Sequence, residues 1–469
     1  MNRIKTGGKV FRDPVHQLIR IAPDDEYILE LIDTPEFQRL RRIRQLGVSW
    51  LTYHGAEHSR FSHSLGVFNF AQRIIQSLQQ KYGRASEIAT SLGEHERVLK
   101  AAALLHDVGH APFSHMLEKV SGGMHHEART VDIILDEQSQ IHKVLKGHEL
   151  NPKDVASVIR KDFPVKLVVD IVSSQLDADR MDYLLRDSLH TGVGYGEYDS
   201  EWLLHALCAG RLSNDPKSPK FKLCLDRSRG LHAAERFILA RLHMYQQVYM
   251  HRATRGFEVM LRNLFKAAAH CATDGHTLPD DTPPLIVRYF SSGGKLNHAD
   301  FLQFDESQMI AALHVWAVAE DQRYATIQML SQSFLNRQRL YVAVDIDGKP
   351  ETMLKLGQAV MSLPKEADGC TDIYGLDTIE DTPYKGMLYQ VGKSATDSDA
   401  DEDIINNSIL LADSGSVDRA LPVESVSHML KALDAEKFQT SRLYFNRNRR
   451  DDIAKTLGSV LPSLKELKN

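Results

Sequence analysis

Four side chains that lie far apart along the chain could together bind a divalent metal. His106 and Asp107 are adjacent within the apolar stretch Ala101–Val108, His63 lies upstream, and Asp179 lies downstream. Imidazole and carboxylate groups are seldom buried without a partner, because removing them from water is costly unless something satisfies them. Two imidazole nitrogens and two carboxylates suit Fe, Mn, Zn, Mg or Ni, with open positions left for water and phosphate oxygens. This quartet predicts a metal-dependent hydrolase.

Histidines are concentrated around the same region. Nine of the 22 histidines lie between His54 and His126, which favours metal binding and proton transfer over a scatter of surface side chains. A glycine and a proline bracket the segment after the metal pair, and a loop there would bring His110 and His115 back towards the metal. His115 could protonate a leaving oxygen because an imidazole titrates near neutral pH, and His126 could be a further proton donor or phosphate ligand. The alternative is that these histidines cap helices.

Two further helices carry side chains that could line a substrate pocket. Asp179, Tyr183 and Asp187 are spaced i, i+4 and i+8 and therefore share one helix face, with Arg180 beside them. An ordinary charged helix face would have the same spacing.

A second long helix, over residues 230–251, has Arg241 and Tyr249 on one side. A guanidinium can bind phosphate oxygens in a fork, and a phenol ring can stack on a base or sugar. The same helix also carries Arg236 and His243, so a solvated basic face is the competing interpretation.

These side chains require a mainly helical body to position them. Apolar residues at three- and four-residue spacing predict helices over most of residues 26–272. The predicted helices span residues 36–46, 64–82, 94–108, 127–138, 166–174, 179–187, 201–207, 230–251 and 256–270. After residue 294 the predicted secondary structure changes from helical to mixed. The chain is predicted to be helical over 300–335, with strands over 340–346, 386–391 and 409–411. One further strand is predicted over 220–226. The predicted fold class is mainly α, with a helical core over residues 1–290 and a smaller α+β C-terminal region over 291–469.

Bulk properties narrow the class of protein. The net charge of −5 argues against a protein that coats nucleic acids, so any nucleotide chemistry must depend on a local basic cluster. The four cysteines are widely spaced, which favours reduced thiols over a disulfide framework. No signal peptide and no apolar run of membrane-spanning length is recognisable, so we expect a cytoplasmic protein without a membrane partner.

The motifs resemble those of the HD-domain phosphohydrolases, and in detail the deoxynucleoside triphosphate (dNTP) triphosphohydrolases of the SAM-and-HD-domain type and their bacterial relatives. The resemblance runs from about residue 9 to 270, with the HD motifs over about 58–190. The matching stretches are Lys9–His16, Asp33–Arg41, Gln45–Gly47, His58–Gly66, His106–His115, Asp179–Asp187 and Tyr249–Arg252.

The resemblance implies a role for each group of residues. A divalent metal would be held by His63, His106, Asp107 and Asp179. Water would attack the α-phosphorus and release a deoxynucleoside and triphosphate, with catalytic roles for Asp107, His110, His115 and His126. Phosphates would be held by Arg60, Arg180, Tyr183 and Arg241. The sugar 3′-hydroxyl would be read by Gln45 and Asp187, and Leu46 and Tyr249 would pack where a 2′-hydroxyl would clash.

Relatives of this kind are often activated by nucleotides bound between subunits. The resemblance therefore implies a GTP or dNTP activator and a homo-oligomer, either a tetramer or a dimer. The matching activator residues are Lys9, Val10, Asp33, Arg41, Arg227 and Arg229. The chain departs from the pattern at Glu201, where an arginine is expected, and the basic residues of Asn336–Arg339 do not align cleanly.

Two other functions compete with dNTP hydrolysis. An HD-type phosphodiesterase or phosphomonoesterase could use the same metal site on another nucleotide, because a fold does not fix a substrate. Such an enzyme has no need of Gln45 and Leu46, which favours dNTPs. A nucleotide sensor or nucleic-acid-binding protein is the second alternative; the intact metal quartet argues against it, as does the net acidity.

Overall fold

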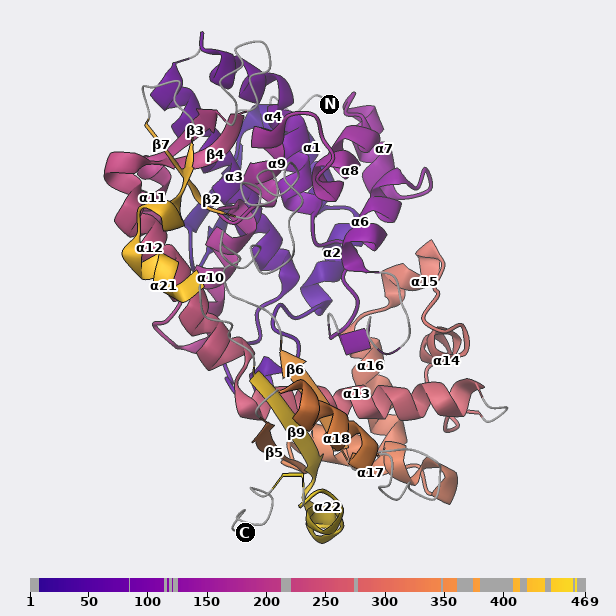
Figure 1. Ribbon diagram of the computed structural model, residues 1–469. Coiled ribbons are helices and arrows are strands. Elements are labelled where there is room, and N and C mark those ends of the chain that lie inside the picture. The colour runs from indigo at the N-terminus through magenta and orange to yellow at the C-terminus, as the bar shows by residue number, and fades with distance from the viewer. Residues whose placement is uncertain are drawn as a thin grey trace.

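The chain was analysed as a computed structural model, and the mainly helical fold class is confirmed (Figure 1). The described residues are 8–83, 85–113, 116–117, 120, 125–211, 221–273, 277–346, 349–360, 374–379, 408–413, 420–434, 440–458 and 460–461. Among them no helix combines the length and the apolar character that crossing a membrane requires.

Helices α3 (Arg60–Tyr82) and α4 (Glu87–Leu105) form the centre of the helical body, and α10 (Ala178–Thr191) packs against α3. Gly83 ends α3 with a positive φ of 74°, and the Ser86 side chain accepts from the backbone N–H of Ala89 to begin α4. The second half of α4 is buried on nearly every side, as its continuous apolar run predicts.

The other helices of this body surround the central pair. They are α1 (Glu26–Ile32), α2 (Pro35–Gln38), α6 (His126–Leu135), α7 (Gln140–Gly147), α8 (Pro152–Arg160), α9 (Lys166–Val172), α11 (Ser200–Ala206), α12 (Arg227–Met244) and α13 (Arg252–Thr273), and a π-helical turn (Tyr245–Tyr249) joins the last two.

The prediction of one helix over 36–46 was wrong. The helix gives way to a 3-10 turn at Arg39–Arg42, and Ile43 is extended because its carbonyl accepts from the backbone N–H of Arg60.

Small sheets lie against the helical body. Strands β1 (Lys9–Asp13) and β2 (Gln17–Ile21) form an antiparallel hairpin that the sequence did not predict. The predicted strand near residue 220 is confirmed as β4 (Phe221–Asp226), which pairs with β3 (Leu207–Arg211). The predicted strand near 409 is confirmed as β7 (Leu410–Ala412); it pairs in parallel with β4 and antiparallel with β8 (Leu421–Pro422).

The later part of the chain combines helices with a three-stranded antiparallel sheet of order β5–β9–β6, which lies at the opposite end of the molecule from α4 (Figure 1). The helices and sheet strands of this later part of the chain are α14 (Pro284–Ser291), α15 (His298–Gln303), α16 (Glu306–Trp316), α17 (Ala325–Leu335), β5 (Tyr341–Ile346), α18 (Pro350–Val360), β6 (Tyr374–Ile379), α21 (His428–Asp434), β9 (Thr440–Asn446) and α22 (Arg450–Leu457). Helix α13 packs on β5 and β6. The predicted strand over 386–391 lies outside the described residues, and the domain division at residue 290 stays a prediction.

Arg39 joins the helical body to the later part of the chain. Its side chain is completely buried and donates to the carbonyl oxygens of Val108 (3.0 Å), His110 (2.5 Å) and Phe304 (2.8 Å). Its guanidinium also lies 4.1 Å from the ring centre of Phe301. One side chain therefore fixes the loop that follows the His106–Asp107 pair against a segment almost two hundred residues later.

We predict that Arg39→Leu lowers the thermal stability of the protein. The substitution leaves three buried carbonyl oxygens without donors, and each such group costs roughly 1–3 kcal/mol. Thermal unfolding followed by circular dichroism measures the effect. Arg20→Leu, at an exposed position on β2, is the matched control and should leave the midpoint unchanged. Equal midpoints for the two variants would contradict this role of Arg39.

Candidate metal centre

Three helices bring the predicted metal ligands together. His63 lies in the first turns of α3, His106 directly follows α4, and Asp179 lies in the first turn of α10. The ligand atoms of these three residues lie within 4.8 Å of one another. His63 Nε2 is 3.0 Å from Asp179 Oδ1, and His106 Nε2 is 3.9 Å from the same oxygen. Residues more than a hundred positions apart thus form one compact cluster.

Hydrogen bonds orient both imidazoles towards the centre of this cluster. His106 Nδ1 lies 2.9 Å from the carbonyl oxygen of Ala103, and His63 Nδ1 lies 2.9 Å from Asp182 Oδ2. Both partners are acceptors, so each ring donates from Nδ1, and in its neutral form it presents a lone pair at Nε2. His106 Nε2 is buried and has no hydrogen-bond partner among the described residues. A buried nitrogen of this kind, facing carboxylate oxygens, fits a divalent cation.

Asp107, the fourth predicted ligand, lies against the cluster and is paired with Arg60. Arg60 Nη1 donates to Asp107 Oδ2 over 2.6 Å, while Asp107 Oδ1 is 3.4 Å from His106 Nε2. Burial alone would raise the pKa of Asp107, but the charge of Arg60, the neighbouring His106 and the hydrogen bond from His110 hold it well below its usual range. Asp107 is therefore ionised at neutral pH and is available to a cation.

Of the three predicted proton-transfer histidines, His110 lies beside this carboxylate and His126 stacks on His110. His110 Nε2 is 3.2 Å from Asp107 Oδ1, and the rings of His110 and His126 stack with centroids 3.9 Å apart and planes 15° apart. Burial and the nearby Arg60 lower the pKa of His110 well below its usual value, so its imidazole is neutral at pH 7. His115, the predicted general acid, lies outside the described residues.

A row of aromatic and acidic side chains leads away from the cluster along α10 and the π-helical turn. The Tyr249 hydroxyl donates to Asp187 Oδ2 over 2.8 Å, and His58 Nε2 lies 2.8 Å from the other Asp187 oxygen. The rings of Tyr183 and Tyr249 meet edge to face with centroids 6.3 Å apart. Burial and the Asp187 carboxylate raise the pKa of Tyr249 well above its usual value, so its phenol stays protonated.

Two arginines predicted to bind phosphate are held near the same row. Arg241 is buried and donates from Nη1 to Gln175 Oε1 over 2.7 Å, which leaves its Nε without a hydrogen-bond partner among the described residues. Arg180 is paired with Asp177, and its Nε is likewise buried and unpaired. Both guanidiniums retain a donor that a phosphate oxygen could use.

Two of the four predicted sugar contacts, Gln45 and Leu46, lie on the segment before α3. The backbone N–H of Gln45 donates to the His58 carbonyl oxygen over 3.0 Å, and its side-chain Oε1 is buried without a hydrogen-bond partner among the described residues. Leu46 is half-buried against the hydrophobic core. Arg60 Nη2 lies 3.5 Å from the Gln45 carbonyl oxygen, so this pair lies beside the arginine that binds Asp107.

The six predicted activator residues lie on separate surface elements. Lys9 and Val10 are exposed on β1, Asp33 follows α1, Arg41 lies in the 3-10 turn, and Arg227 and Arg229 begin α12. The Arg41 guanidinium lies 3.5 Å from the ring centre of Phe61, and Arg227 is 3.7 Å from an Asp413 oxygen.

Sequence reasoning missed the side chains that hold the metal ligands in place. Asp182 binds His63, and Arg186 donates to both oxygens of Asp182 over 2.7 and 3.0 Å. Both residues are completely buried. Their i, i+4 spacing on α10 was the available signal, because a carboxylate and a guanidinium so placed can pair on one helix face.

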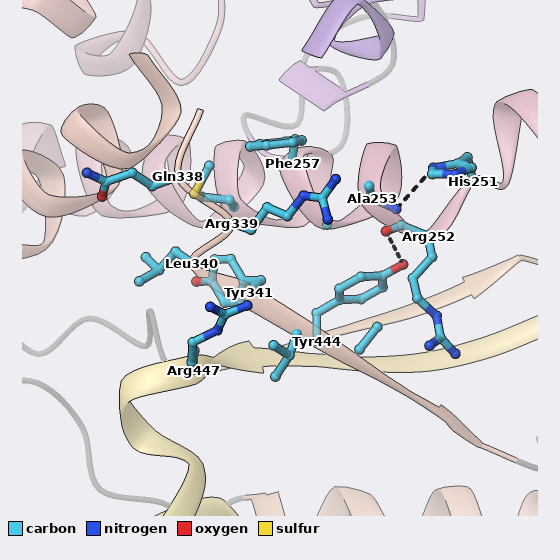
Figure 2. A pocket seen from close by; sticks show the side chains of 14 residues that line it. His251, Arg252, Ala253, Phe257, Gln338, Arg339, Leu340, Tyr341, Tyr444 and Arg447 are labelled. Carbon is cyan, nitrogen blue, oxygen red and sulfur yellow. Dashed lines mark hydrogen bonds between the residues drawn. The ribbon is translucent and has the colours of Figure 1, made fainter. Parts of the chain in front are cut away.

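A separate basic pocket of about 610 Å³ lies between α13 and the C-terminal sheet, and none of the metal cluster lines it. Figure 2 shows Arg339 between Phe257 on the helix and Tyr444 on the strand, with Arg252 and Arg447 at the pocket wall. Three arginines beside aromatic rings could bind an anionic ligand that carries an aromatic group.

Comparisons with known proteins agree with this site. The HD domain family matches residues 60–187, and the HD associated region matches residues 210–280. The uncharacterized protein YwfO of Bacillus subtilis (strain 168) is 40% identical over 380 residues, which cover 80% of this chain and 81% of YwfO. This chain therefore belongs to the HD-domain phosphohydrolase superfamily.

More distant relatives include proteins with named activities. The deoxynucleoside triphosphate triphosphohydrolase SAMHD1 of Mus musculus is 31% identical over 218 residues, which cover 39% of this chain and 32% of the mouse protein. A crystal structure of a phosphohydrolase from Bacteroides thetaiotaomicron VPI-5482 matches with a TM-score of 0.70 and 27% identity, covering 94% of this chain and all of that one.

We predict that metal binding releases a proton and strengthens as pH rises. Burial alone would lower the pKa of His63, but hydrogen bonds to Asp179 and Asp182 raise it to about 10 in the metal-free protein. A cation must displace that proton, so affinity should rise about tenfold per pH unit below this pKa. Titration calorimetry with Mn²⁺ in buffers of different ionisation enthalpy measures the release.

The same pKa sets the pH dependence of stability. Because the pKa of His63 is raised in the folded state, its contribution to the stability of the metal-free protein is complete below the unfolded value of about 6.5 and is lost as pH rises towards 10. His232→Ala removes an exposed imidazole and should leave both behaviours unchanged. Metal affinity that is flat between pH 6.5 and 8.5 would contradict the assignment.

Proposed function

We propose that the protein hydrolyses deoxynucleoside triphosphates to a deoxynucleoside and triphosphate, by water attack at the α-phosphorus, using a divalent metal. The observation that carries this proposal is the cluster of His63, His106 and Asp179, in which His106 Nε2 is buried and has no hydrogen-bond partner among the described residues. A divalent cation bound by these residues and Asp107 would polarise phosphate oxygens and activate water.

The remaining groups act on the substrate and on protons. The guanidiniums of Arg180 and Arg241, whose buried Nε donors have no hydrogen-bond partner in the part of the chain that the structure describes, suit the phosphate chain. Neutral His110, beside Asp107 and stacked on His126, can accept a proton or pass one to the leaving oxygen. In the proposal His115 is the final donor to that oxygen.

A deoxynucleotide substrate is supported by the polar groups around the sugar positions. Within the described parts of the chain Gln45 Oε1 is buried without a hydrogen-bond partner, and Asp187 is fixed by His58 and Tyr249, so these two side chains could read a 3′-hydroxyl. Leu46 and the Tyr249 ring supply apolar contacts on which a 2′-hydroxyl would lose hydration. The named activity of the mouse relative, a deoxynucleoside triphosphate triphosphohydrolase, agrees with this choice.

Regulation by nucleotide is the second part of the proposal. The activator would be GTP or a dNTP, bound where subunits of a tetramer or dimer meet, with Lys9, Val10, Asp33, Arg41, Arg227 and Arg229 as its contacts. The exposure of Lys9, Val10 and Arg41 is compatible with such an interface. The basic pocket of Figure 2 adds a second surface whose chemistry suits a phosphorylated ligand.

We predict that Asp179→Asn abolishes both metal retention and dNTP hydrolysis. Asn preserves the size of the side chain but removes the charge that a hard cation requires. Each dNTP, alone and in mixtures, is incubated with the protein and Mg²⁺ or Mn²⁺, and chromatography measures free triphosphate. Asp321→Asn, in an exposed ion pair, is the matched control. Release of orthophosphate or pyrophosphate instead of triphosphate would favour the phosphodiesterase or phosphomonoesterase alternative.

A second substitution tests the sugar contact. Leu46→Gly should relax discrimination against ribonucleotides, because it removes the side chain against which a 2′-hydroxyl would be placed. The ratio of kcat/KM for dATP to that for ATP should fall about tenfold, the scale of one apolar contact in a pocket. Leu354→Gly at an exposed position on α18 is the control. An unchanged ratio in Leu46→Gly would remove Leu46 from the sugar site.

A further inference from the structure

The carboxylate of Asp182 receives four donors from three separate parts of the chain. Oδ2 is 2.9 Å from His63 Nδ1 and accepts from Arg186 Nε over 2.7 Å. Oδ1 is 2.7 Å from His16 Nε2 and accepts from Arg186 Nη2 over 3.0 Å. All four side chains in this network are at most 3% exposed. Only an ionised carboxylate, which accepts at both oxygens, satisfies this arrangement.

The hairpin β1–β2 supplies the outer part of the same network. Asp13 Oδ2 accepts from Arg186 Nη1 over 2.9 Å, and its Oδ1 accepts from the backbone N–H groups of Val15 (2.9 Å) and His16 (3.0 Å). Asp13 therefore builds the hairpin turn and binds Arg186 with one side chain. The hairpin turn also places the His16 ring edge-on to the Phe70 ring of α3, with the two ring centroids 4.9 Å apart.

The network has no room for adjustment on the side of α3. Gly66 faces it, and a Cβ at this position would overlap with Asp182 Oδ1 and with the Arg186 guanidinium. With the backbone of α3 on one side and the hairpin turn on the other, the plane of the Asp182 carboxylate is fixed. Its Oδ2 in turn fixes the orientation of the His63 ring.

We propose that Asp13 and His16, in the turn of the N-terminal hairpin, are positioning residues of the metal centre and act through Asp182 on His63. Both lie outside residues 60–187, the stretch matched by the HD domain family. The proposal rests on the metal-binding part of the proposed function and is independent of the substrate.

The two hairpin residues act on different sides of Asp182. Without His16, Oδ1 keeps only one donor, and the carboxylate can rotate away from the plane in which it holds His63. Without the charge of Asp13, Arg186 loses the acceptor for Nη1, and its two-point contact with Asp182 is no longer fixed. Partners that orient a ligating histidine typically contribute about 10- to 100-fold to metal affinity.

The experiment measures Mn²⁺ binding to the metal-free full-length protein by titration calorimetry and records the visible spectrum of the Co²⁺ form. His16→Leu keeps the bulk against Phe70 and removes the donor. His16→Gln retains an amide N–H that can reach Asp182 Oδ1. Asp13→Asn removes the charge at the turn, and Ile19→Ala, at a buried position on β2, weakens hairpin packing without touching the network.

We expect His16→Leu and Asp13→Asn to weaken Mn²⁺ binding by about tenfold and to change the Co²⁺ spectrum, while His16→Gln stays within about twofold of the natural protein. Ile19→Ala should lower the melting temperature and leave affinity unchanged. The proposal is overturned if His16→Leu binds Mn²⁺ as the natural protein does, or if Ile19→Ala loses affinity equally, because the hairpin would then act only through stability. Absence of Mn²⁺ binding in the natural protein would instead overturn the metal site itself.

Discussion

The buried carboxylate of Asp182 is the group on which the rest of the site depends. A charge without access to water is tolerated only when it is paired and its acceptor positions are filled. Arg186 supplies the opposite charge, and His16 and His63 supply the remaining donors. Because these partners come from β1–β2, α3 and α10, the three elements must be packed correctly before His63 has a defined orientation.

Arg39 plays a comparable part on the other side of the metal centre. It satisfies the carbonyl oxygens of the loop that carries His110 and, at the same time, that of Phe304. The loop that carries His110 is therefore supported by a segment beyond residue 300. Next to Phe304, Asp305 pairs with Arg42 and Glu306 pairs with Arg44. The later part of the chain thus contributes to the geometry of the site, although none of its described residues belongs to the metal cluster.

A short stretch of chain connects the predicted sugar contact Tyr249 with the basic pocket. Tyr249 ends the π-helical turn and contacts Asp187, and His251 and Arg252, two and three residues further on, line the pocket. The π turn changes the helical register, so consecutive residues face different surroundings. The predicted sugar contact Tyr249 and the basic pocket are therefore neighbours along the backbone, although Tyr249 does not line the pocket.

The sequence by itself predicted a metal site and most of the helices. Residue types at His63, His106, Asp107 and Asp179 are enough to predict a metal although the four lie far apart along the chain, and apolar periodicity is enough to predict α3, α4, α10 and α12 because helical spacing is a local signal. It did not reveal the β1–β2 hairpin, whose strands are short and largely exposed, and it extended the helix at 36 too far, because the bond between Ile43 and Arg60 is a tertiary contact. Only the tertiary structure decided that Asp182 and not a solvent molecule orients His63, that Arg60 pairs with Asp107, and that arginines from α13, from the 3-10 turn after β9 and from the segment before β5 share one pocket. Those contacts join residues up to two hundred positions apart, and their energies come from burial and from charges brought together by folding, which spacing along the chain does not encode.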